Sequence, residues 1–335
     1  MDARAIICRE DQSFSLEAVM LPGPAPGNMV VRTLWSGVSI GTEFALIRGK
    51  LSWGPYPLCT GYQAVGVIEE AGPEVAGFRA GDRVYYRDNK SIRLPDGRPV
   101  SAVSGTHCSR AVINPRDTHG VALLPEGVAE DVASLFVMPA VGLYGVDMAN
   151  PRMGSTVVVY GAGMIGLGVV AACAHRGCVV VAVDVQQHRL DVALRLGADH
   201  VVNGASEDVE ARVRRIAPAG ADVVFEATGI PACIDRAVPL CREGGTFVFQ
   251  GNYGQEPISF HFLPAHGRKL TAVFPCDDGL APCRRAVLKN MATGALKWEQ
   301  VITHRVEAEE APDLFGRINR GDARDVLGAV IRWSD

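Results

Sequence analysis

The segment STVVVYGAGMIGLGVVAACAHRGCVVVAVD, residues 155–184, decides the fold class of this chain. An apolar run, a glycine-rich turn, an apolar helical stretch and a second apolar run follow one another without a break. Buried parallel strands have such continuous apolar sequences, and they need helical crossovers between them. The alternation continues through HVVN, ADVVFEATG and GGTFVFQG. The sequence therefore predicts an α/β fold with a doubly wound parallel sheet.

Three glycines in the turn of this segment point to a dinucleotide. Gly161, Gly163 and Gly166 follow the first strand directly and open the helix. In a dinucleotide-binding turn, such glycines serve the tight turn, the approach of the pyrophosphate to the backbone and close helix–strand packing. Met164 and Ile165 lie at the helix start, where free N–H groups can bind phosphate. These five residues are the predicted phosphate-binding turn.

The end of the second strand indicates which dinucleotide binds. Asp184 follows the run CVVVAV, and its carboxylate can accept hydrogen bonds from a ribose 2′-hydroxyl while repelling a 2′-phosphate. The expected cofactor is therefore NAD, with NADP the weaker alternative. Arg189 lies five residues further on and would weaken this preference if its guanidinium reached a phosphate.

Composition and charge limit the class of protein. The chain has 335 residues, of which 48% are hydrophobic and 21% charged, and its net charge is −4. This balance is typical of a globular protein large enough for two domains, and no basic run indicates a nucleic acid or a membrane as a partner. The opening MDARAIICRE carries charges where a signal peptide has an apolar core, and the nine cysteines form no CxxC pair. A cytoplasmic protein with reduced thiols and a small-molecule substrate is expected.

The sequence outside the parallel-sheet segment has a different texture. Residues 1 to about 125 show short β-like runs between Gly, Pro and Asp turns, and the tail returns to short strands around one helix. This pattern indicates a cofactor domain inserted into a discontinuous β-rich domain. The predicted domains are 1–138 with 276–335, and 139–275.

Longer motifs resemble one known superfamily. They are GVIEEAGPEVAGFRAGDRV, GAGMIG, RLDVALRLGADHVV, ADVVFEATG and VITHRVEAEEAPDLF. Together they resemble the medium-chain dehydrogenase/reductase superfamily, in its zinc alcohol dehydrogenase-like group. The resemblance implies a GroES-like catalytic domain, a Rossmann domain and an active site in the cleft between them. It also implies a homodimer formed through the strand LTAVFPC, and further cofactor contacts at Thr228, Gln250, Gly251 and Phe274.

The chain departs from this family at the positions that usually hold a catalytic zinc. The first ligand position falls at Ser39 or Ile40, the GHE motif has become Gly61-Tyr62-Gln63, and the third position falls near Met138. Zinc prefers thiolate, imidazole or carboxylate ligands. No zinc is therefore expected. The alternative is a site rebuilt from residues elsewhere, namely Cys59, Glu43, His107 or Cys108.

Without a metal, other side chains have to hold the substrate oxygen. Thr42 matches the Ser/Thr that binds this oxygen in the family, and Tyr62 stands where a zinc-binding histidine would be. Glu43 is expected to orient Tyr62. The alternative for Tyr62 is that it only fills the vacated space as a core residue. Four further residues are candidates for lining the substrate pocket: Trp53, Tyr56, His107 and Met138.

These residues lead to one function with two alternatives. The chain is expected to be an NAD-dependent, zinc-independent oxidoreductase that interconverts a secondary alcohol and a ketone. The motif SIGTE followed by GY also resembles the branch that contains bacteriochlorophyllide hydroxyethyl dehydrogenases. The alternatives are an NAD(P)H-dependent quinone or ene reductase and a catalytically silent cofactor-binding protein.

Overall fold

The computed structural model describes residues 1–51, 54–89, 91–118 and 120–334, and it divides the chain into two compact units. The β-rich unit comprises Met1–Phe136, Leu288–Ala295 and Ile302–Asp335. The parallel-sheet unit comprises Val137–Val287 and Leu296–Val301. Each unit has its own hydrophobic core, as expected for a chain of this length.

The two units differ from the predicted domains at residues 137–138, 276–287 and 296–301. Residues 276–287 group with the parallel-sheet unit rather than with the β-rich domain. Within this segment, a buried ion pair joins Arg284 Nε to Asp278 Oδ2 at 2.6 Å. Cys283 Sγ also lies 3.7 Å from Asp147 Oδ2 in the same unit. Helix α9 (Leu280–Ala292) therefore begins in the parallel-sheet unit and ends in the β-rich unit.

The parallel-sheet unit confirms the predicted doubly wound fold. Among the described residues, six strands pair in the order β12-β11-β10-β13-β14-β15, and every pairing is parallel. This is the Rossmann strand order, whose switch point lies between β10 and β13. The strand bounds are β10 Thr156–Tyr160, β11 Val179–Asp184, β12 His200–Asn203, β13 Ala221–Glu226, β14 Cys241–Phe249 and β15 Thr271–Val273.

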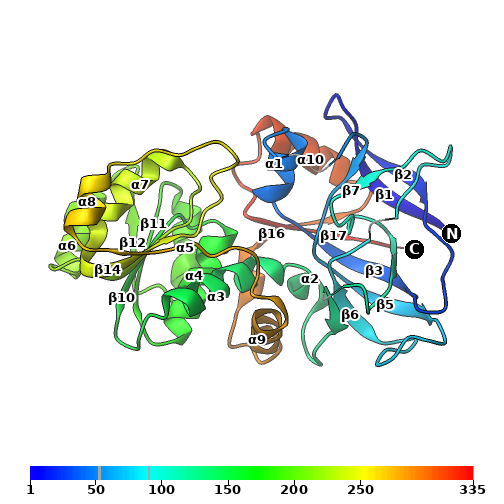
Figure 1. The fold of residues 1–335 in the computed structure, drawn as a ribbon, viewed down its shortest axis with the longest axis horizontal. Coiled ribbons are helices and arrows are strands. Elements are labelled where there is room, and N and C mark those ends of the chain that lie inside the picture. The colour runs from blue at the N-terminus through cyan, green and yellow to red at the C-terminus, as the bar shows by residue number, and fades with distance from the viewer. Residues whose placement is uncertain (52–53, 90, 119, 335) are drawn as a thin grey trace. The chain divides into compact units, whose positions relative to one another are not determined.

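Helices cover this sheet (Figure 1). Branched apolar strand residues such as Val158, Val181 and Val224 are fully buried, because helices leave no face of these strands to solvent. Val213 of α6 and Ile234 of α7 close the core on one side. The helices of this unit are α3 Val137–Ala149, α4 Met164–His175, α5 Gln187–Arg195, α6 Val209–Ile216, α7 Pro231–Ala237 and α8 Phe262–Gly267, with short 3₁₀ turns η1 Val238–Leu240 and η2 Trp298–Val301.

The β-rich unit is built on two sheets. The described strands of the larger sheet run in the order β16-β17-β3-β5-β6-β9, with β8 also paired to β3, and those of the smaller sheet in the order β2-β1-β4-β7. The strand bounds are β1 Asp2–Cys8, β2 Phe14–Met20, β3 Met29–Val38, β4 Leu58–Cys59, β5 Ala64–Ala71, β6 Arg83–Tyr86, β7 Ser101–Ala102, β8 Arg110–Ile113, β9 Val121–Leu123, β16 Ile302–Glu307 and β17 Gly328–Arg332; the short helix α2 spans Glu130–Ala133.

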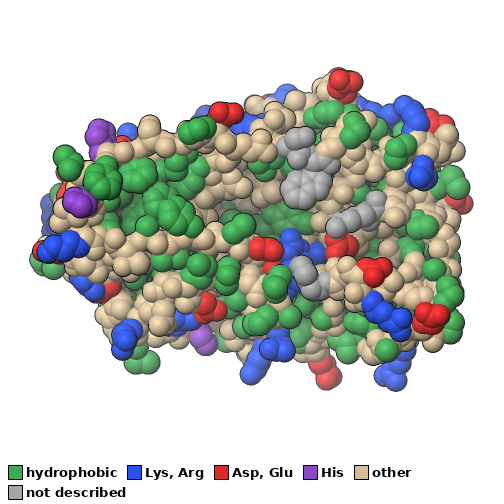
Figure 2. Space-filling view, viewed as in Figure 1, with side chains coloured by type: hydrophobic (Ala, Val, Ile, Leu, Met, Phe, Trp, Pro, Cys, Tyr) green, Lys and Arg blue, Asp and Glu red, His purple; other side chains and the backbone are tan. Residues whose placement is uncertain are grey.

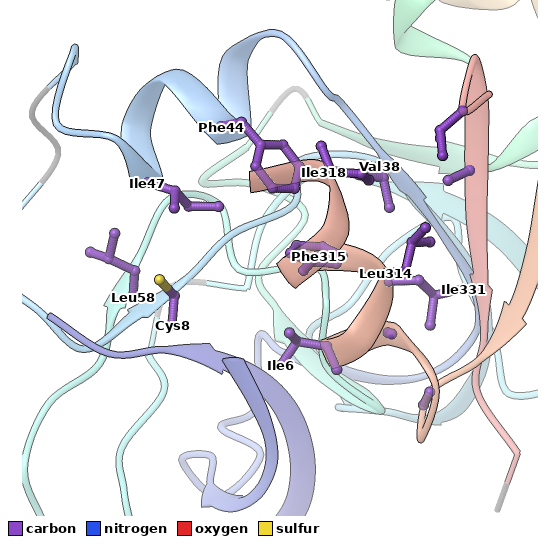
Figure 3. Packing of buried hydrophobic residues seen from close by; sticks show 14 of the residues in the cluster. Ile6, Cys8, Val38, Phe44, Ile47, Leu58, Leu314, Phe315, Ile318 and Ile331 are labelled. Carbon is purple, nitrogen blue, oxygen red and sulfur yellow. The ribbon is translucent and has the colours of Figure 1, made fainter. Parts of the chain in front are cut away.

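Two helices of the β-rich unit share a core that fixes the start of α1. Helix α1 (Thr42–Ile47) and helix α10 (Ala311–Arg320) meet through Phe44 and Phe315, whose ring centroids lie 5.4 Å apart. Figure 3 shows these rings between Ile47, Leu58 and Ile318, with residues of β1 and β17 around them. Because Phe44 is fully buried, the preceding residues Thr42 and Glu43 are held in place. Within the described ranges, no helix combines the length and the apolar character needed to cross a bilayer.

Candidate functional site

The three glycines of the turn between β10 and α4 differ in their surroundings: protein atoms crowd Gly161 and Gly166, whereas Gly163 is open to a ligand. Gly161 has a φ of +106°, and a Cβ there would lie 2.8 Å from Thr228 Cγ2. A Cβ on Gly166 would lie 1.9 Å from the carbonyl oxygen of Gly161, so this glycine is needed for close helix–strand packing. A Cβ on Gly163 would meet nothing within 4 Å, although Gly163 is the N-cap of α4. Gly163 therefore faces open space at the end of a helix whose first N–H groups can bind phosphate.

A cavity of about 350 Å³ opens beside this turn. It lies at the carboxyl ends of β10, β11 and β13, next to the switch point of the sheet, where such folds bind ligands. Its lining includes Gly161, Gly163, Asp184, Arg189 and Thr228, all of which were predicted as cofactor residues. These residues and this cavity fit a dinucleotide.

Backbone groups fix the carboxylate of Asp184 at this cavity. Its Oδ2 accepts a hydrogen bond from the amide of Ala162 at 2.8 Å, and its Oδ1 accepts one from the amide of Gln186 at 2.9 Å. Each carboxylate oxygen can still accept another bond from a ligand hydroxyl. Arg189 and Arg236 also line this cavity, and the Arg189 Nε is buried with no hydrogen-bond partner among the described residues. One anionic and two cationic side chains therefore surround this space.

The remaining predicted cofactor residues occupy the same unit. Met164 and Ile165 begin α4. Gln250 is buried, and its Nε2 donates to the carbonyl of Val141 at 3.3 Å. A Cβ on Gly251 would lie 2.3 Å from the amide nitrogen of Gly229, which explains a glycine there. Phe274 is exposed and stacks on the ring of Phe249 at 4.6 Å.

Sequence reasoning missed Glu226, which ends β13 and is fully buried. Its Oε1 accepts a bond from the amide of Thr228 at 2.9 Å and another from the Thr228 hydroxyl. Its Oε2 accepts one from the hydroxyl of Tyr253, and burial together with this carboxylate raises the pKa of Tyr253. Glu226 thereby ties the loop after β13 to the loop after β14. An acidic residue directly after the apolar run VVF was the signal available in the sequence.

In the β-rich unit, Glu43 is the hub of a second polar site. Its side chain is buried and accepts three hydrogen bonds, from the amide of Ser39 at 2.7 Å, the hydroxyl of Thr60 at 2.7 Å and the Nε2 of His107 at 2.9 Å. The three donors belong to three separate segments of the chain. Backbone bonds join two of these segments, because the amide of His107 donates to the carbonyl of Thr60 at 3.2 Å.

Tyr62 lies beside this hub and is partly buried. Its hydroxyl donates to the Ser39 hydroxyl at 2.5 Å, and the Arg87 guanidinium lies 5.4 Å from the centroid of its ring. Burial raises the pKa of the Tyr62 phenol, and the negative charge of Glu43 raises it further. The hydroxyls of Ser39 and Thr42 and the positive charge of Arg87 act in the opposite direction. The phenol is therefore a neutral hydrogen-bond donor at physiological pH.

The structure changes the predicted role of His107 and shows the route by which Glu43 is linked to Tyr62. His107 was expected to line a pocket, but it is fully buried and contacts Glu43, because the segments that carry Thr60 and His107 are hydrogen-bonded side by side. Glu43 was expected to orient Tyr62, yet its carboxylate is hydrogen-bonded to Ser39, Thr60 and His107, and its link to the phenol runs through Ser39.

The other predicted pocket residues are dispersed. The Tyr56 hydroxyl donates to the carbonyl of Ile47 at 2.8 Å, and its ring packs against the core around α1 and α10. Met138 is buried within α3 of the parallel-sheet unit. Trp53 lies outside the described residues.

Comparisons with known proteins place the chain among dehydrogenases. Residues 25–120 match the alcohol dehydrogenase GroES-like domain, and residues 165–291 match the zinc-binding dehydrogenase family. The chain is 28% identical over 341 residues to 2-desacetyl-2-hydroxyethyl bacteriochlorophyllide A dehydrogenase of Cereibacter sphaeroides, covering 99% of each protein. It is 29% identical over 280 residues to sorbitol dehydrogenase 1 of Saccharomyces cerevisiae, covering 77% of each.

Solved structures agree on the fold. A putative zinc-binding dehydrogenase from Sinorhizobium meliloti, bound to NADP, superposes with a TM-score of 0.85 at 23% identity and covers 99% of each chain. Both the GroES-like and the Rossmann parts of the predicted fold are thus confirmed. The two matched domains are those of zinc-type, alcohol dehydrogenase-like medium-chain dehydrogenases/reductases, and the chain is a dehydrogenase/reductase.

Proposed function

We propose that this chain interconverts a secondary alcohol and a ketone, with NAD as its preferred cofactor and with side chains in place of zinc at the substrate oxygen. The observation that carries this proposal is the contact between Tyr62 and Ser39, whose hydroxyl oxygens lie 2.5 Å apart at the positions where zinc-type relatives hold metal ligands. Two hydroxyls and the nearby Thr42 offer hydrogen bonds to an oxygen where a metal would polarise it.

The side chains at these positions are a poor donor set for zinc. Zinc sites use thiolate, imidazole or carboxylate ligands, and the positions at issue hold serine or isoleucine, tyrosine, glutamine and methionine. Two zinc-type ligands do lie nearby, in Glu43 and His107, but they are hydrogen-bonded to each other at 2.9 Å. Metal binding would have to break that bond and leave the Thr60 and Ser39 donors without their acceptor. The proposed chemistry therefore involves no zinc.

The proposed chemistry follows from the protonation state of Tyr62. A bound nicotinamide supplies or accepts the hydride. During reduction, the Tyr62 hydroxyl turns its hydrogen from the Ser39 oxygen to the carbonyl oxygen, and the Ser39 hydroxyl donates to the phenol oxygen in its place. The phenol proton then passes to the substrate oxygen. Solvent returns a proton to the phenolate. Because the raised pKa keeps the phenol neutral, Tyr62 suits carbonyl reduction better than alcohol oxidation near neutral pH.

Asp184 supports NAD as the preferred cofactor. Two backbone amides hold its carboxylate at the cavity, where it can accept bonds from a ribose 2′-hydroxyl and would repel a 2′-phosphate. Arg189 and Arg236 offset part of this repulsion. We therefore expect a preference for NAD with measurable use of NADP.

Two measurements on the purified protein test this function. Elemental analysis should find less than about a tenth of a zinc per chain, since the donor set lacks zinc ligands. Initial rates with NADH and NADPH should then be compared for the ketones acetoin and xylulose and for a simple enone such as methyl vinyl ketone. Ketone reduction driven by NADH supports the proposal. Faster enone reduction with NADPH would identify an ene reductase instead, and tight NADH binding with no turnover would identify a binding protein.

A homodimer is the proposed assembly. Strand β15 is the last strand of the described sheet, and its residues Thr271 and Ala272 are exposed. Phe262, Leu263 and Phe274 are exposed apolar side chains of the same unit. Figure 2 shows hydrophobic side chains gathered over the region of α8. An open strand edge flanked by apolar side chains is a surface that a second copy can cover.

A further inference from the structure

A buried chain of hydrogen bonds continues from Glu43 through His107 and Ser36 to Trp333, the residue that follows β17. The Nδ1 of His107 lies 2.9 Å from the Ser36 hydroxyl, and the indole Nε1 of Trp333 donates to the same hydroxyl at 2.9 Å. Ser36 and His107 are fully buried, and Trp333 is 4% exposed. The alcohol–ketone chemistry described above gives no role to these three residues.

The chemistry of the donors fixes the direction of this chain. An indole N–H can only donate, so it takes a lone pair of the Ser36 hydroxyl. The hydrogen of that hydroxyl then needs an acceptor, and the described contacts offer the Nδ1 of His107. His107 therefore carries its hydrogen on Nε2 and donates it to Glu43 Oε2. Glu43, which also accepts from Ser39 and Thr60, is an ionised carboxylate with donors at both oxygens.

We propose that Glu43 and His107 form a positioning pair, oriented by Ser36 and Trp333, that holds the Ser39 and Tyr62 hydroxyls in place as a neutral proton donor. This role rests on the proposed alcohol–ketone function. Neither residue of the pair touches the reacting atoms. The pair acts on Tyr62 in two ways. Glu43 holds the backbone amide of Ser39, and its negative charge, which a neutral His107 does not cancel, acts on the phenol.

The geometric part of this role follows from the segments that Glu43 joins. Its Oε1 holds the amide of Ser39, whose hydroxyl accepts the bond from Tyr62. Its Oε2 holds the Thr60 hydroxyl, two residues before Tyr62. The two segments that carry the hydroxyl pair therefore have one buried anchor in common. A bidentate anchor of this kind limits the positions that the two oxygens can adopt.

The electrostatic part follows from the groups that surround Tyr62. The Glu43 charge raises the pKa of the phenol, and Arg87 on the other side lowers it. The titratable groups around His107 and Glu43 are the thiols of Cys59 and Cys108. Burial raises the pKa of Cys59, and it raises that of Cys108 to about 11, so both remain neutral thiols in ordinary buffers. Burial is the largest influence on the pKa of Tyr62, and Glu43 and Arg87 are the two charges that shift this pKa in opposite directions.

The first experiment observes the imidazole directly and needs no substrate. Protein labelled with ¹⁵N-histidine is examined by long-range ¹H–¹⁵N correlation near neutral pH, where the two tautomers are distinguishable. The chain has eight histidines, and the His107 signal is assigned by its loss in H107Q. The expected state has a protonated Nε2 and an unprotonated Nδ1. An imidazolium, or a hydrogen on Nδ1, would overturn the proposed pair.

A second experiment tests the link to Tyr62. Protein labelled with ¹³Cζ-tyrosine is titrated to alkaline pH, and the Tyr62 signal among the seven tyrosines is assigned with Y62F. In E43Q the lost negative charge should lower the pKa of Tyr62. The exposed His261, which is hydrogen-bonded to Asp235 at 2.9 Å in the other unit, provides the control variant H261Q. An unchanged or raised pKa in E43Q would contradict the electrostatic role.

Rescue separates positioning from proton transfer. In H107Q the amide N–H₂ can donate to Glu43 and its oxygen can accept from Ser36, which preserves the polarity of the neutral imidazole. With NADH and the faster of acetoin or xylulose, H107Q should keep kcat within about threefold, whereas H107L should lose about tenfold or more with KM for NADH unchanged. Equal losses in H107Q and H107L would refute the polarity argument. If the wild type reduces neither ketone, the proposed function fails, and the two NMR measurements still decide the state of the pair.

Discussion

The hydroxyl oxygens of Tyr62 and Ser39 lie 2.5 Å apart, and the amide of Ser39 is held by the buried carboxylate of Glu43. This arrangement makes Tyr62 the proposed proton donor, so Y62F should lower kcat for ketone reduction by about 10²-fold or more. Binding of NADH, followed by its fluorescence, should not change, because Tyr62 belongs to the β-rich unit and the dinucleotide cavity to the other. A Y62F enzyme with nearly full kcat would reduce Tyr62 to a packing role.

Arg87 and Glu43 should move the alkaline limb of the reduction profile in opposite directions. Arg87 lowers the pKa of Tyr62 and Glu43 raises it. In R87Q the pKa of the Tyr62 phenol rises, so the proton donor stays protonated to a higher pH. The alkaline limb therefore moves to higher pH. In E43Q the pKa of the Tyr62 phenol falls, so the alkaline limb moves to lower pH. The measurement is log(kcat/KM) against pH for both variants and the wild type. Shifts of the same sign in both would show that another group sets the limb.

Asp184 should control the choice between NAD and NADP. In D184A the repulsion of a 2′-phosphate disappears while Arg189 and Arg236 remain at the cavity. The Kd for NADPH should fall about tenfold and that for NADH should rise by a similar factor, since Asp184 offers hydrogen bonds to a ribose hydroxyl. The double variant D184A/R189A should lose part of the gain for NADPH. An unchanged ratio of the two Kd values in D184A would remove Asp184 from this role.

The fold could be predicted because its signals are local. The apolar runs of β10 and β11 and the glycines between them lie within one short segment, and their order requires a parallel sheet. The dinucleotide cavity follows from the same segment, because Asp184 ends the neighbouring strand. Glu226 had a local signal as well, but its role depends on the loop that carries Tyr253.

The polar site of the β-rich unit could not be predicted in the same way. Glu43 and His107 are 64 residues apart in the sequence, and Ser36 and Trp333 are 297 apart. No periodicity or motif brings such residues together, since their contact depends on how β3, β17 and the loops between them pack. From the family resemblance, Glu43 was expected to orient Tyr62. In the structure, the carboxylate of Glu43 is hydrogen-bonded to His107 instead.

Phe315 should be the residue on which the placement of α1 most depends. It contacts the rings of Phe14, Phe44 and His107 at centroid distances of 5.5, 5.4 and 5.4 Å. F315A should lower the free energy of unfolding by about 3–5 kcal/mol, as other buried Phe→Ala changes do. F14A, a partly buried contact of the same ring, should cost less. Urea unfolding of the two variants gives the comparison, and equal losses would argue against a central role for Phe315.

If the dimer forms through the edge of β15, charged substitutions on the surface beside that edge should lower the mass of the assembly in solution. The double substitution F262D/L263D places charges on side chains that are 64% and 74% exposed, so a single chain should fold as before. If a second copy covers this surface, the charges are buried without partners and the dimer should dissociate. Sedimentation equilibrium should give twice the 35.7 kDa of one chain for the wild type and a single chain for the variant. The double substitution M153D/L194D, at two other exposed apolar side chains of this unit, is the matched control. A wild type that sediments as one chain would refute the dimer, and dissociation in both variants would place the contact elsewhere.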